Sequence, residues 1–260
     1  TVGIMLIPQG MAYAMLAGLD PIHGLYAVTV PILLYAIFGT SRQLAVGPVA
    51  MVSLLTAAGI GALNPSSPEQ YLLYALTLAF MIGLIQFGMG VLRFGFFVNF
   101  LSHPVINGFT SAAAIIIGLS QAKHLFGIEL PRSEYFQDIM VNIYHNIGGI
   151  NWTAFAIGLG GIIIIKFGKK IHKSLPTPLL AVVFGILLVW GFGLTANGVS
   201  VLGEVPSGLP GLSSPSFSME TWSVLLPIAI TISLVSFAES FAVAKIIQGK
   251  HKDYKLDANQ

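Results

Sequence analysis

The segment Gln43–Val52, with the sequence QLAVGPVAMV, opens a long apolar run and contains a Gly-Pro pair at positions 47 and 48. The run continues through Ser53–Ala58, which gives it the composition of a membrane span. Proline lacks an N–H group and its ring clashes with the carbonyl four residues earlier, so a continuous helix through Pro48 would be strained. Proline is favoured as the first helical residue, however, and directs the preceding residue toward extended geometry. We therefore predict an extended Gln43–Gly47 followed by a helix that begins at Pro48 within the membrane.

A helix that begins at this depth leaves the N–H groups of Val49, Ala50 and Met51 without intrahelical partners. Together with the helix dipole, these groups would form an anion site that needs no buried cation. Irregular backbone at membrane depth is tolerated only where protein or a water-filled cavity surrounds it. A simple proline kink in a continuous helix explains the same Gly-Pro pair, and the motif alone does not separate the two interpretations.

The composition of the chain indicates a polytopic membrane protein. Of its 260 residues, 55% are hydrophobic and 8% are charged, whereas soluble domains are about 25% charged. The mean hydropathy is +0.84. The net charge of +2 gives no reason to expect a nucleic-acid partner, and the lack of cysteine excludes disulfides and thiolate metal sites. Because HExxH, GxSxG and Walker motifs are also absent from the sequence, we expect neither an enzyme nor a bound metal or cofactor.

Apolar segments of spanning length recur along the chain. A spanning helix needs about 20 mostly apolar residues, and eight segments are predicted to span: Thr1–Leu19, His23–Gly39, Leu44–Ala62, Tyr71–Phe94, Phe97–Gln121, Trp152–Phe167, Pro178–Leu194 and Trp222–Gln248. Between them, the amphipathic stretch Ser133–Asn146 is predicted to form a short surface helix. The chain starts inside an apolar segment without an initiator methionine, so we expect that its beginning is missing.

Basic residues gather on one side of this arrangement. If the N-terminus is cytoplasmic, ten Lys and Arg residues lie on the cytoplasmic side, and only Lys123 and Arg132 lie outside. Cytoplasmic loops of membrane proteins are enriched in Lys and Arg. We therefore predict a multi-pass membrane protein with a cytoplasmic N-terminus. The location that we expect for it is the inner (plasma) membrane of a bacterium.

The first apolar segment contains a second helix breaker, Pro8, which is followed by Gln9 and, one turn later, by Tyr13. Residues four apart share a helix face, so an amide and a phenol would point the same way and could hydrogen-bond a polar ligand. Gln9 could equally bond a neighbouring helix while Tyr13 packs between helices. Both interpretations stay open at this point.

Glu239 is the only acidic residue deep within an apolar run, and it shares a helical face with Ser236 and Ser240. Ionisable residues in spans are functional by default. A carboxyl that is removed from water can take up and release protons near neutral pH, which favours a functional role for Glu239. A structural salt bridge is the alternative. It needs a partner elsewhere, because Lys245 is six residues away and poorly placed on a helix.

Five stretches of the sequence carry a resemblance to a known family. They are PQGMAYAMLAGLDPIHGLYAV (8–28), FGTSRQLAVGPVAMVSLL (38–55), LSHPVINGFTSAAAIIIGLSQ (101–121), PSGLPGL (206–212) and FAESFAVAKIIQGKHKDYKLDANQ (237–260). In this order, and over essentially the whole chain, they resemble the SulP family of sulfate permeases and anion exchangers.

The resemblance implies an all-α transport domain of fourteen spans in two inverted repeats of seven. Spans one to four and eight to eleven would form a mobile core, and the others a gate or scaffold. Spans three and ten would each be a short extended piece plus a half-helix, with their N-termini facing each other across a central anion site. On this pattern residues 1–260 form one transport domain, with a first repeat at about 1–195, an outer loop at about 196–221, span eight at about 222–248 and a cytoplasmic end at 249–260.

Site residues follow from the resemblance, position by position. Gln9 and Tyr13 match first-span residues that contact the anion, and Val49 and Ala50, directly after Pro48, match the N-terminus of the third-span half-helix. Glu239 matches an acidic eighth-span residue associated with proton coupling in sulfate and dicarboxylate symporters, and Ser240 lies beside it. Exchangers and the motor protein prestin lack that acid, which favours proton-coupled uptake.

The chain departs from the family in extent. Span ten, with its basic residue, and the cytoplasmic STAS domain that members usually carry are both absent from the sequence given. We therefore expect a truncated chain that supplies one half of the anion cage.

Together these features predict a secondary active transporter of a small oxyanion, first of all sulfate, that works by proton symport and alternating access as a homodimer in the lipid bilayer. Transport of bicarbonate or a dicarboxylate, with sodium coupling, and anion exchange are alternatives within the same class. A non-transporting membrane sensor or scaffold is the alternative of another class.

Overall fold

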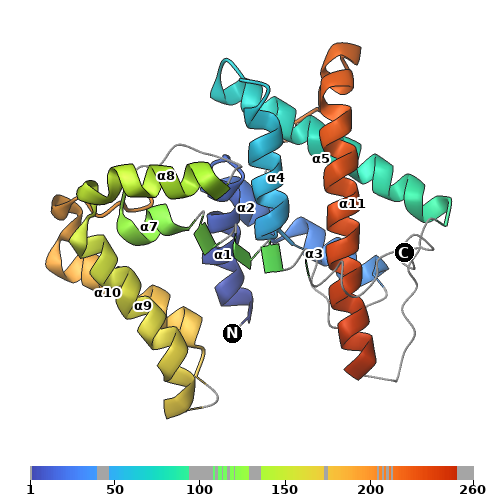
Figure 1. Cartoon of the computed structure of the whole chain (residues 1–260). Coiled ribbons are helices and arrows are strands. Elements are labelled where there is room, and N and C mark those ends of the chain that lie inside the picture. The colour runs from blue at the N-terminus through green and yellow to red at the C-terminus, as the bar shows by residue number, and fades with distance from the viewer. Residues whose placement is uncertain are drawn as a thin grey trace. The chain divides into compact units, whose positions relative to one another are not determined.

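The computed structural model describes residues 2–39, 47–93, 121–128, 136–172, 175–203 and 213–250, together with single positions at 108, 111, 112, 114, 115, 118, 119, 205, 206, 208 and 211. In these residues the secondary structure is helical and contains no strand, as the sequence predicted (Figure 1). The chain divides into two compact units. The larger unit comprises Gln9–Ser111 and Pro206–Gln260, and the smaller unit comprises Thr1–Pro8 and Ala112–Val205.

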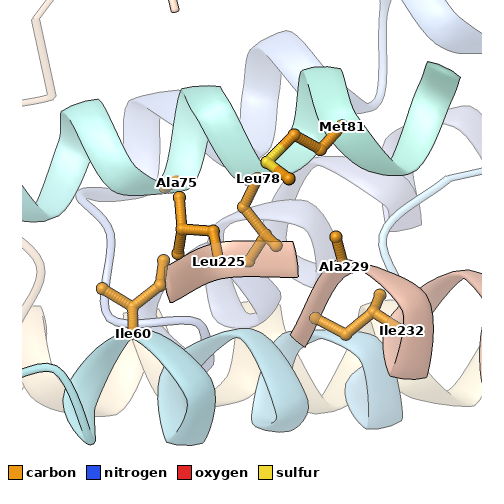
Figure 2. Packing of buried hydrophobic residues seen from close by; sticks show 7 residues of the cluster. All are labelled: Ile60, Ala75, Leu78, Met81, Leu225, Ala229 and Ile232. Carbon is orange, nitrogen blue, oxygen red and sulfur yellow. The ribbon is translucent and has the colours of Figure 1, made fainter. Parts of the chain in front are cut away.

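The larger unit contains the part of α1 that follows Pro8 and five further described helices. Their bounds are α1 (Val2–Leu16), α2 (Pro21–Ala27), α3 (Val30–Phe38), α4 (Ala50–Gly61), α5 (Pro68–Val91) and α11 (Met219–Lys250). Its core is an apolar cluster where α4, α5 and α11 meet, and Figure 2 shows side chains from all three helices pointing into it. The cluster residues are Ile60, Ala75, Leu78, Met81, Leu225, Ala229 and Ile232.

Close packing holds these three helices together. Lipid tails are as apolar as these side chains, so helix association in a bilayer relies on van der Waals contact between close-fitting surfaces. Ile60 and Leu225 are fully buried. A Cβ atom at Gly59 would lie 2.5 Å from Cγ2 of Ile228, so the glycine is what lets α4 approach α11 at this level.

Hydrogen bonds connect the segment before α11 to the middle of α5. The backbone N–H of Ser216 donates to Oγ1 of Thr77 (2.9 Å), and the Thr77 hydroxyl donates to the carbonyl of Leu73 (2.7 Å). The indole N–H of Trp222 donates to the carbonyl of Ser216 (2.7 Å), and its ring meets Phe80 edge to face at 6.3 Å. Thr77 is fully buried. These hydrogen bonds therefore satisfy polar groups that would destabilise the fold if they were buried without partners.

The smaller unit is built around an antiparallel helix pair. Its described helices are α7 (Ala122–Phe126), α8 (Phe136–Asn146), α9 (Trp152–Ile171) and α10 (Thr177–Phe192), with short 3₁₀ turns at Ile147–Gly149 and Leu194–Asn197. Asn151 caps α9 by accepting from the N–H groups of Thr153 and Ala154 (both 3.0 Å). The helical stretch that ends at Gly149 makes an angle of 119° with α9. The predicted surface helix at Ser133–Asn146 is therefore present as α8, and it does not continue into the span.

The predicted spans are recovered as helices to different extents. Among the described residues, three helical segments are long and apolar enough to cross a membrane: Pro21–Phe38, Pro68–Val91 and Met219–Ser240. Counting the bent pair of α8 and α9 as one span raises this number to four, and α1, α4 and α10 are shorter apolar helices. The predicted span Phe97–Gln121 lies almost entirely outside the described residues. The structure thus shows an apolar helical protein and does not establish eight spans.

The predicted span His23–Gly39 corresponds to the span-length segment Pro21–Phe38, which is interrupted between α2 and α3. α2 ends at Ala27 and α3 begins at Val30. Pro31, which the span prediction passed over, cannot donate an N–H and excludes the carbonyl four residues back. The hydroxyl of Thr29 lies within hydrogen-bond distance of the carbonyls of Leu25 (3.0 Å) and Tyr26 (2.9 Å) at the end of α2 and can donate its one hydrogen to either.

Candidate functional site

The N-terminus of α4 has no side-chain cap among the described residues. Val49 is the N-cap residue, with extended backbone (φ −127°, ψ 147°) and no side-chain capping hydrogen bond. The first hydrogen bond of the helix runs from the N–H of Ser53 to the carbonyl of Val49 (3.0 Å). The N–H groups of Ala50, Met51 and Val52 precede it and have no acceptor one turn back. They point out of the helix end and carry the positive pole of its dipole.

The helix begins two residues later than the sequence predicted. Pro48 was expected as the first helical residue, but it precedes the N-cap, and Ala50 is the first residue of α4. The β-branched side chain of Val49 favours extended geometry over helix, which moves the start along the chain. The extended stretch is described from Gly47 onward, and Gln43–Val46 lie outside the described residues. The observed break is a true helix start, so the proline kink is the wrong interpretation.

The packing of α4 on α11 sets the level of this helix end. The two helices run in opposite directions (Figure 1), and their contact at Gly59 and Ile228 fixes their register. Ala50 lies nine residues before Gly59, and Phe237 lies nine residues after Ile228. At about 1.5 Å per residue along each helix, the start of α4 is level with Phe237. Glu239 is two residues further, so its backbone is about 3 Å away along the axis.

Glu239 and Ser240 are half-buried on α11 at this level. Oε2 of Glu239 is buried and has no hydrogen-bond partner among the described residues. No salt bridge from a described residue reaches it, so the structural ion pair considered from the sequence is not seen in that part of the chain. Buried carboxyl oxygens are normally hydrogen-bonded, and an orphaned one favours a group that exchanges a proton or faces a ligand.

Gln9 and Tyr13 form a hydrogen-bonded pair on α1. The side-chain amide of Gln9 donates to the hydroxyl of Tyr13 over 3.2 Å, which confirms that the two share a face one turn apart. Gln9 is exposed and Tyr13 half-buried. The Tyr13 hydroxyl accepts in this bond, so its own hydrogen stays available to a ligand, as does the second amide hydrogen of Gln9.

Small residues hold this part of α1 in place. Gly10, Ala14 and Ala17 are buried along one stripe, and a Cβ atom at Gly10 would lie 2.9 Å from the carbonyl oxygen of Gly24 in α2. The close backbone approach of α1 and α2 therefore fixes the turn that presents Gln9. The hydrogen bond between the Gln9 and Tyr13 side chains does not extend to α4 or to Glu239 among the described residues.

A hydrogen bond joins the end of α1 to the beginning of α5. The hydroxyl of Tyr71 donates to the carbonyl of Ala17 (2.6 Å), which ties the end of α1 to the beginning of α5. Gln9 lies eight residues before Ala17, about 12 Å along α1, and Ala50 lies about 16 Å before Gly61, where α4 ends beside the same end of α5.

Sequence reasoning missed two buried hydroxyl groups. Ser53 of α4 is 6% exposed and Ser233 of α11 is fully buried, with no partner for the Ser233 hydroxyl among the described residues. Both lie within about one and a half turns of the level of the α4 start. In the sequence, Ser53 lies close to Ala50 on α4, and Ser233 lies close to Glu239 on α11. Only the register of α4 on α11 shows that the two hydroxyl groups lie at similar levels.

The whole chain, residues 1–260, matches the family model described as the sulfate permease family. The chain belongs to the sulfate permease family. Proteins of this family that resemble it are transporters and not enzymes. The predicted resemblance is therefore confirmed, together with the expectation that the protein is not an enzyme.

Relatives of this sulfate permease chain come from plants, bacteria and mammals. "Sulfate transporter 4.1, chloroplastic" of Arabidopsis thaliana is 41% identical over all of this chain and 38% of that protein. A probable sulfate transporter of Mycobacterium tuberculosis is 31% identical over all of this chain and 46% of its own length. Prestin of Tursiops truncatus is 32% identical over 99% of this chain and 38% of that protein. The chain thus spans less than half the length of these relatives.

Solved structures share the fold. The structure of SLC26A9 is 28% identical and superposes with a TM-score of 0.87, covering 98% of this chain and 43% of that one. The transmembrane domain of the cyanobacterial bicarbonate transporter BicA is 22% identical with a TM-score of 0.83, covering 98% of this chain and 66% of its own. At that identity the BicA likeness concerns the fold alone. The likeness to a transmembrane domain agrees with the apolar helices of this chain.

Proposed function

We propose that the full-length protein is a secondary active transporter that carries a small oxyanion, sulfate, together with a proton. The observation that carries the proposal is the N-terminus of α4, which has no side-chain cap among the described residues. It lies level with Oε2 of Glu239 on α11, which has no hydrogen-bond partner among those residues. Membership of the sulfate permease family and relatives named as sulfate transporters support the choice of anion.

The anion would bind at the α4 end through backbone groups. Oxygens of sulfate accept from the N–H groups of Ala50, Met51 and Val52, with about half a positive charge from the helix dipole behind them. The apolar Val49 leaves these donors to the ligand, and Pro48 keeps the preceding chain out of the helix. Gln9 and Tyr13 each hold one further hydrogen to donate, and we assign them to one side of the anion.

Glu239 would carry the proton. When ionised, its carboxylate repels an anion bound nearby; when protonated, it removes that charge and offers a hydrogen-bond donor. Proton and anion binding then favour each other, which is the coupling that symport requires. Ser240, beside it on α11, would contribute its hydroxyl to the same site.

The remaining features of the proposal concern the whole transporter. A second half-helix from the rest of the protein would face α4 across the anion, in an inverted repeat of the same fold. The core would move against a gate to alternate access, in a dimer that also carries a STAS domain. The N-terminus would face the cytoplasm of a bacterial cell, an orientation supported by the bias of ten basic residues against two. The mycobacterial relative supports the bacterial membrane, whereas the plant relative named as chloroplastic supports a plastid one.

Uptake of labelled sulfate into proteoliposomes that contain the full-length protein tests the proposal. We expect uptake to increase when the outside is made more acidic than the inside, and Glu239→Gln to abolish that dependence. Glu220→Gln is the matched control, because Glu220 lies in the exposed first turn of the same helix, far from the proposed site. Unchanged uptake and pH dependence in Glu239→Gln would show that the coupling role is wrong.

The same preparation separates the alternatives. Unlabelled bicarbonate or dicarboxylate that competes better than unlabelled sulfate would reassign the substrate, and a sodium gradient that replaces the proton gradient would reassign the coupling ion. A protein that neither transports nor gains thermal stability with any of these anions would instead be a sensor or scaffold.

A further inference from the structure

A basic and aromatic patch lies at the C-terminal end of α9, in the unit that does not contain the proposed anion site. Lys166 and Lys170 lie one turn apart on the helix, and both ammonium groups approach the ring of Phe167, at 5.8 Å and 5.2 Å from its centroid. Both lysines are exposed, and the Phe167 side chain is 45% exposed. Two cations therefore flank one aromatic ring at the surface of the unit.

Toward the N-terminus of α9, the helix face that carries the two lysines is apolar. Leu159 and Ile163 precede the two lysines at spacings of four, three and four residues, which places all four side chains on one stripe. Leu159 is 44% exposed and Ile163 is 49% exposed. The stripe from Leu159 to Lys170 is about 16 Å long, close to half the roughly 30 Å thickness of a bilayer's hydrocarbon core. An apolar half and a cationic end match the two parts of an anionic phospholipid.

The sequence provides no carboxylate of its own for this end of the helix pair. No Asp or Glu occurs between Asp138 and Glu204, an interval that contains all of α9 and α10. Asp138 precedes the start of α9, and Glu204 follows the end of α10. In this antiparallel pair those two helix ends lie together, opposite the end that carries the lysines. Lys169, His172 and Lys173 add to the basic character of the same segment. The compensating anion must therefore come from outside this hairpin.

We propose that the patch formed by Lys166, Phe167 and Lys170 binds the phosphate of an anionic phospholipid, whose acyl chain lies along Leu159 and Ile163. The ammonium groups supply charge, and the lysine stems and the ring cover the apolar glycerol region, as amphipathic side chains do at membrane interfaces. Free inorganic phosphate lacks the apolar part that the stripe matches, so the site takes the lipid.

Native mass spectrometry of the full-length protein, titrated with dioleoyl phosphatidylglycerol in detergent, tests this site. Each Lys near an anionic lipid surface contributes about 1 kcal/mol, so Lys166→Gln should weaken binding about 5-fold and the double variant Lys166→Gln/Lys170→Gln about 30-fold. Lys166→Arg/Lys170→Arg should retain the lipid. Arg93→Gln is the matched single-charge control, because Arg93 also lies exposed just beyond the end of a long helix, α5.

Three results would overturn the proposal. The first is a double variant that binds phosphatidylglycerol like the parent protein, and the second is a loss of affinity in Lys166→Gln that is no larger than in Arg93→Gln. The third is displacement of the lipid by inorganic phosphate at equal concentration. Because the single variant removes one exposed charge and the arginine variant removes none, the test does not depend on the double variant folding.

Discussion

Two helix starts in the same unit, those of α4 and α5, share a backbone geometry and differ in chemistry. The N-cap residues Val49 and Ser67 are both extended, at φ −127°, ψ 147° and φ −150°, ψ 160°. Ser67 accepts from the N–H of Gln70 through its hydroxyl (3.2 Å), and Gln70 in turn accepts from the N–H of Ser66 (2.6 Å). Glu69 adds a negative charge to the first turn of α5. Val49 provides none of these groups, so among the described residues α5 has a cap of its own and α4 has none.

A structural helix start and a ligand-binding one differ in what satisfies their first N–H groups. A free helix N-terminus in contact with water or lipid is normally capped, because capping is worth about 1 kcal/mol. An uncapped start in a protein interior must be satisfied by something else. In a sulfate permease, the family's anion is the natural candidate for the group that satisfies the start of α4. Substitutions at the two N-cap residues, Val49 and Ser67, test this idea.

The largest expected effect comes from giving α4 a cap of its own. In Val49→Asp, the new carboxylate can accept from the same N–H groups that are proposed to hold sulfate. We expect sulfate affinity, measured by isothermal titration on the full-length protein, to fall about 30-fold or more, since a helix dipole is worth up to about 2 kcal/mol to an anion. Thermal stability without sulfate should hold or rise.

An aspartate at the N-cap position of α5 is the control. Ser67→Asp places a carboxylate at a helix end that is already capped, so sulfate affinity should stay within about 2-fold of the parent value. Equal losses of affinity in the Val49 and Ser67 variants would mean that the open start of α4 has no special role.

The register of α4 on α11 is tested by filling the space at Gly59. A Cβ atom there would lie 2.5 Å from Cγ2 of Ile228, so Gly59→Ala should push the helices apart and cost about 1–3 kcal/mol of stability. Sulfate affinity should fall as well, because the α4 start would move relative to Glu239. The double variant Gly59→Ala/Ile228→Ala should recover part of both losses. Additive losses in unfolding and binding measurements would contradict the register.

Removing the cap of α5 should affect stability alone. Ser67→Ala leaves the N–H of Gln70 without its acceptor, and we expect a loss of about 1 kcal/mol in the free energy of unfolding. Val49→Ala should change that free energy much less, because Val49 has no capping bond to lose. Reversible unfolding in mixed detergent micelles measures both, and equal losses would remove the contrast between the two helix starts.

The smallest effect is expected from the α1 pair. Tyr13→Phe removes the hydroxyl that accepts from Gln9 and that is proposed to donate to the anion. One neutral hydrogen bond is worth about 1 kcal/mol, so sulfate affinity should fall about 5-fold while the maximal uptake rate stays measurable. An affinity equal to that of the parent protein would assign Tyr13 to helix packing.

Much of this architecture was accessible from the sequence because its signals are local. The break at Gly47-Pro48, the shared face of Gln9 and Tyr13, and the amphipathic stretch that becomes α8 each depend on residues within about four turns of one another. The start of α4 was predicted at Pro48, whereas the helix begins at Ala50. The prediction gave more weight to proline's preference for the first helical position than to the preference of Val49 for extended backbone. The break between α2 and α3 was missed although Pro31 signalled it.

Long-range packing was not accessible in this way. The bond from Ser216 to Thr77 joins residues 139 positions apart, and no local pattern predicts such a pairing. The same holds for the contact of Gly59 with Ile228, which brings the α4 start level with Glu239. Sequence reasoning therefore found the candidate residues, and the helix packing was needed to relate them.

The most direct test of the open α4 start is to locate the anion itself. Selenate has the shape and charge of sulfate and contains an anomalous scatterer, so crystals of the full-length protein grown with selenate would reveal the position of the selenium atom. We expect a single selenium peak about 4 Å from the backbone nitrogens of Ala50, Met51 and Val52, the distance set by hydrogen bonds of about 2.9 Å to the selenate oxygens. A bound selenate that lies elsewhere, with the α4 N–H groups satisfied by protein, would contradict the proposal.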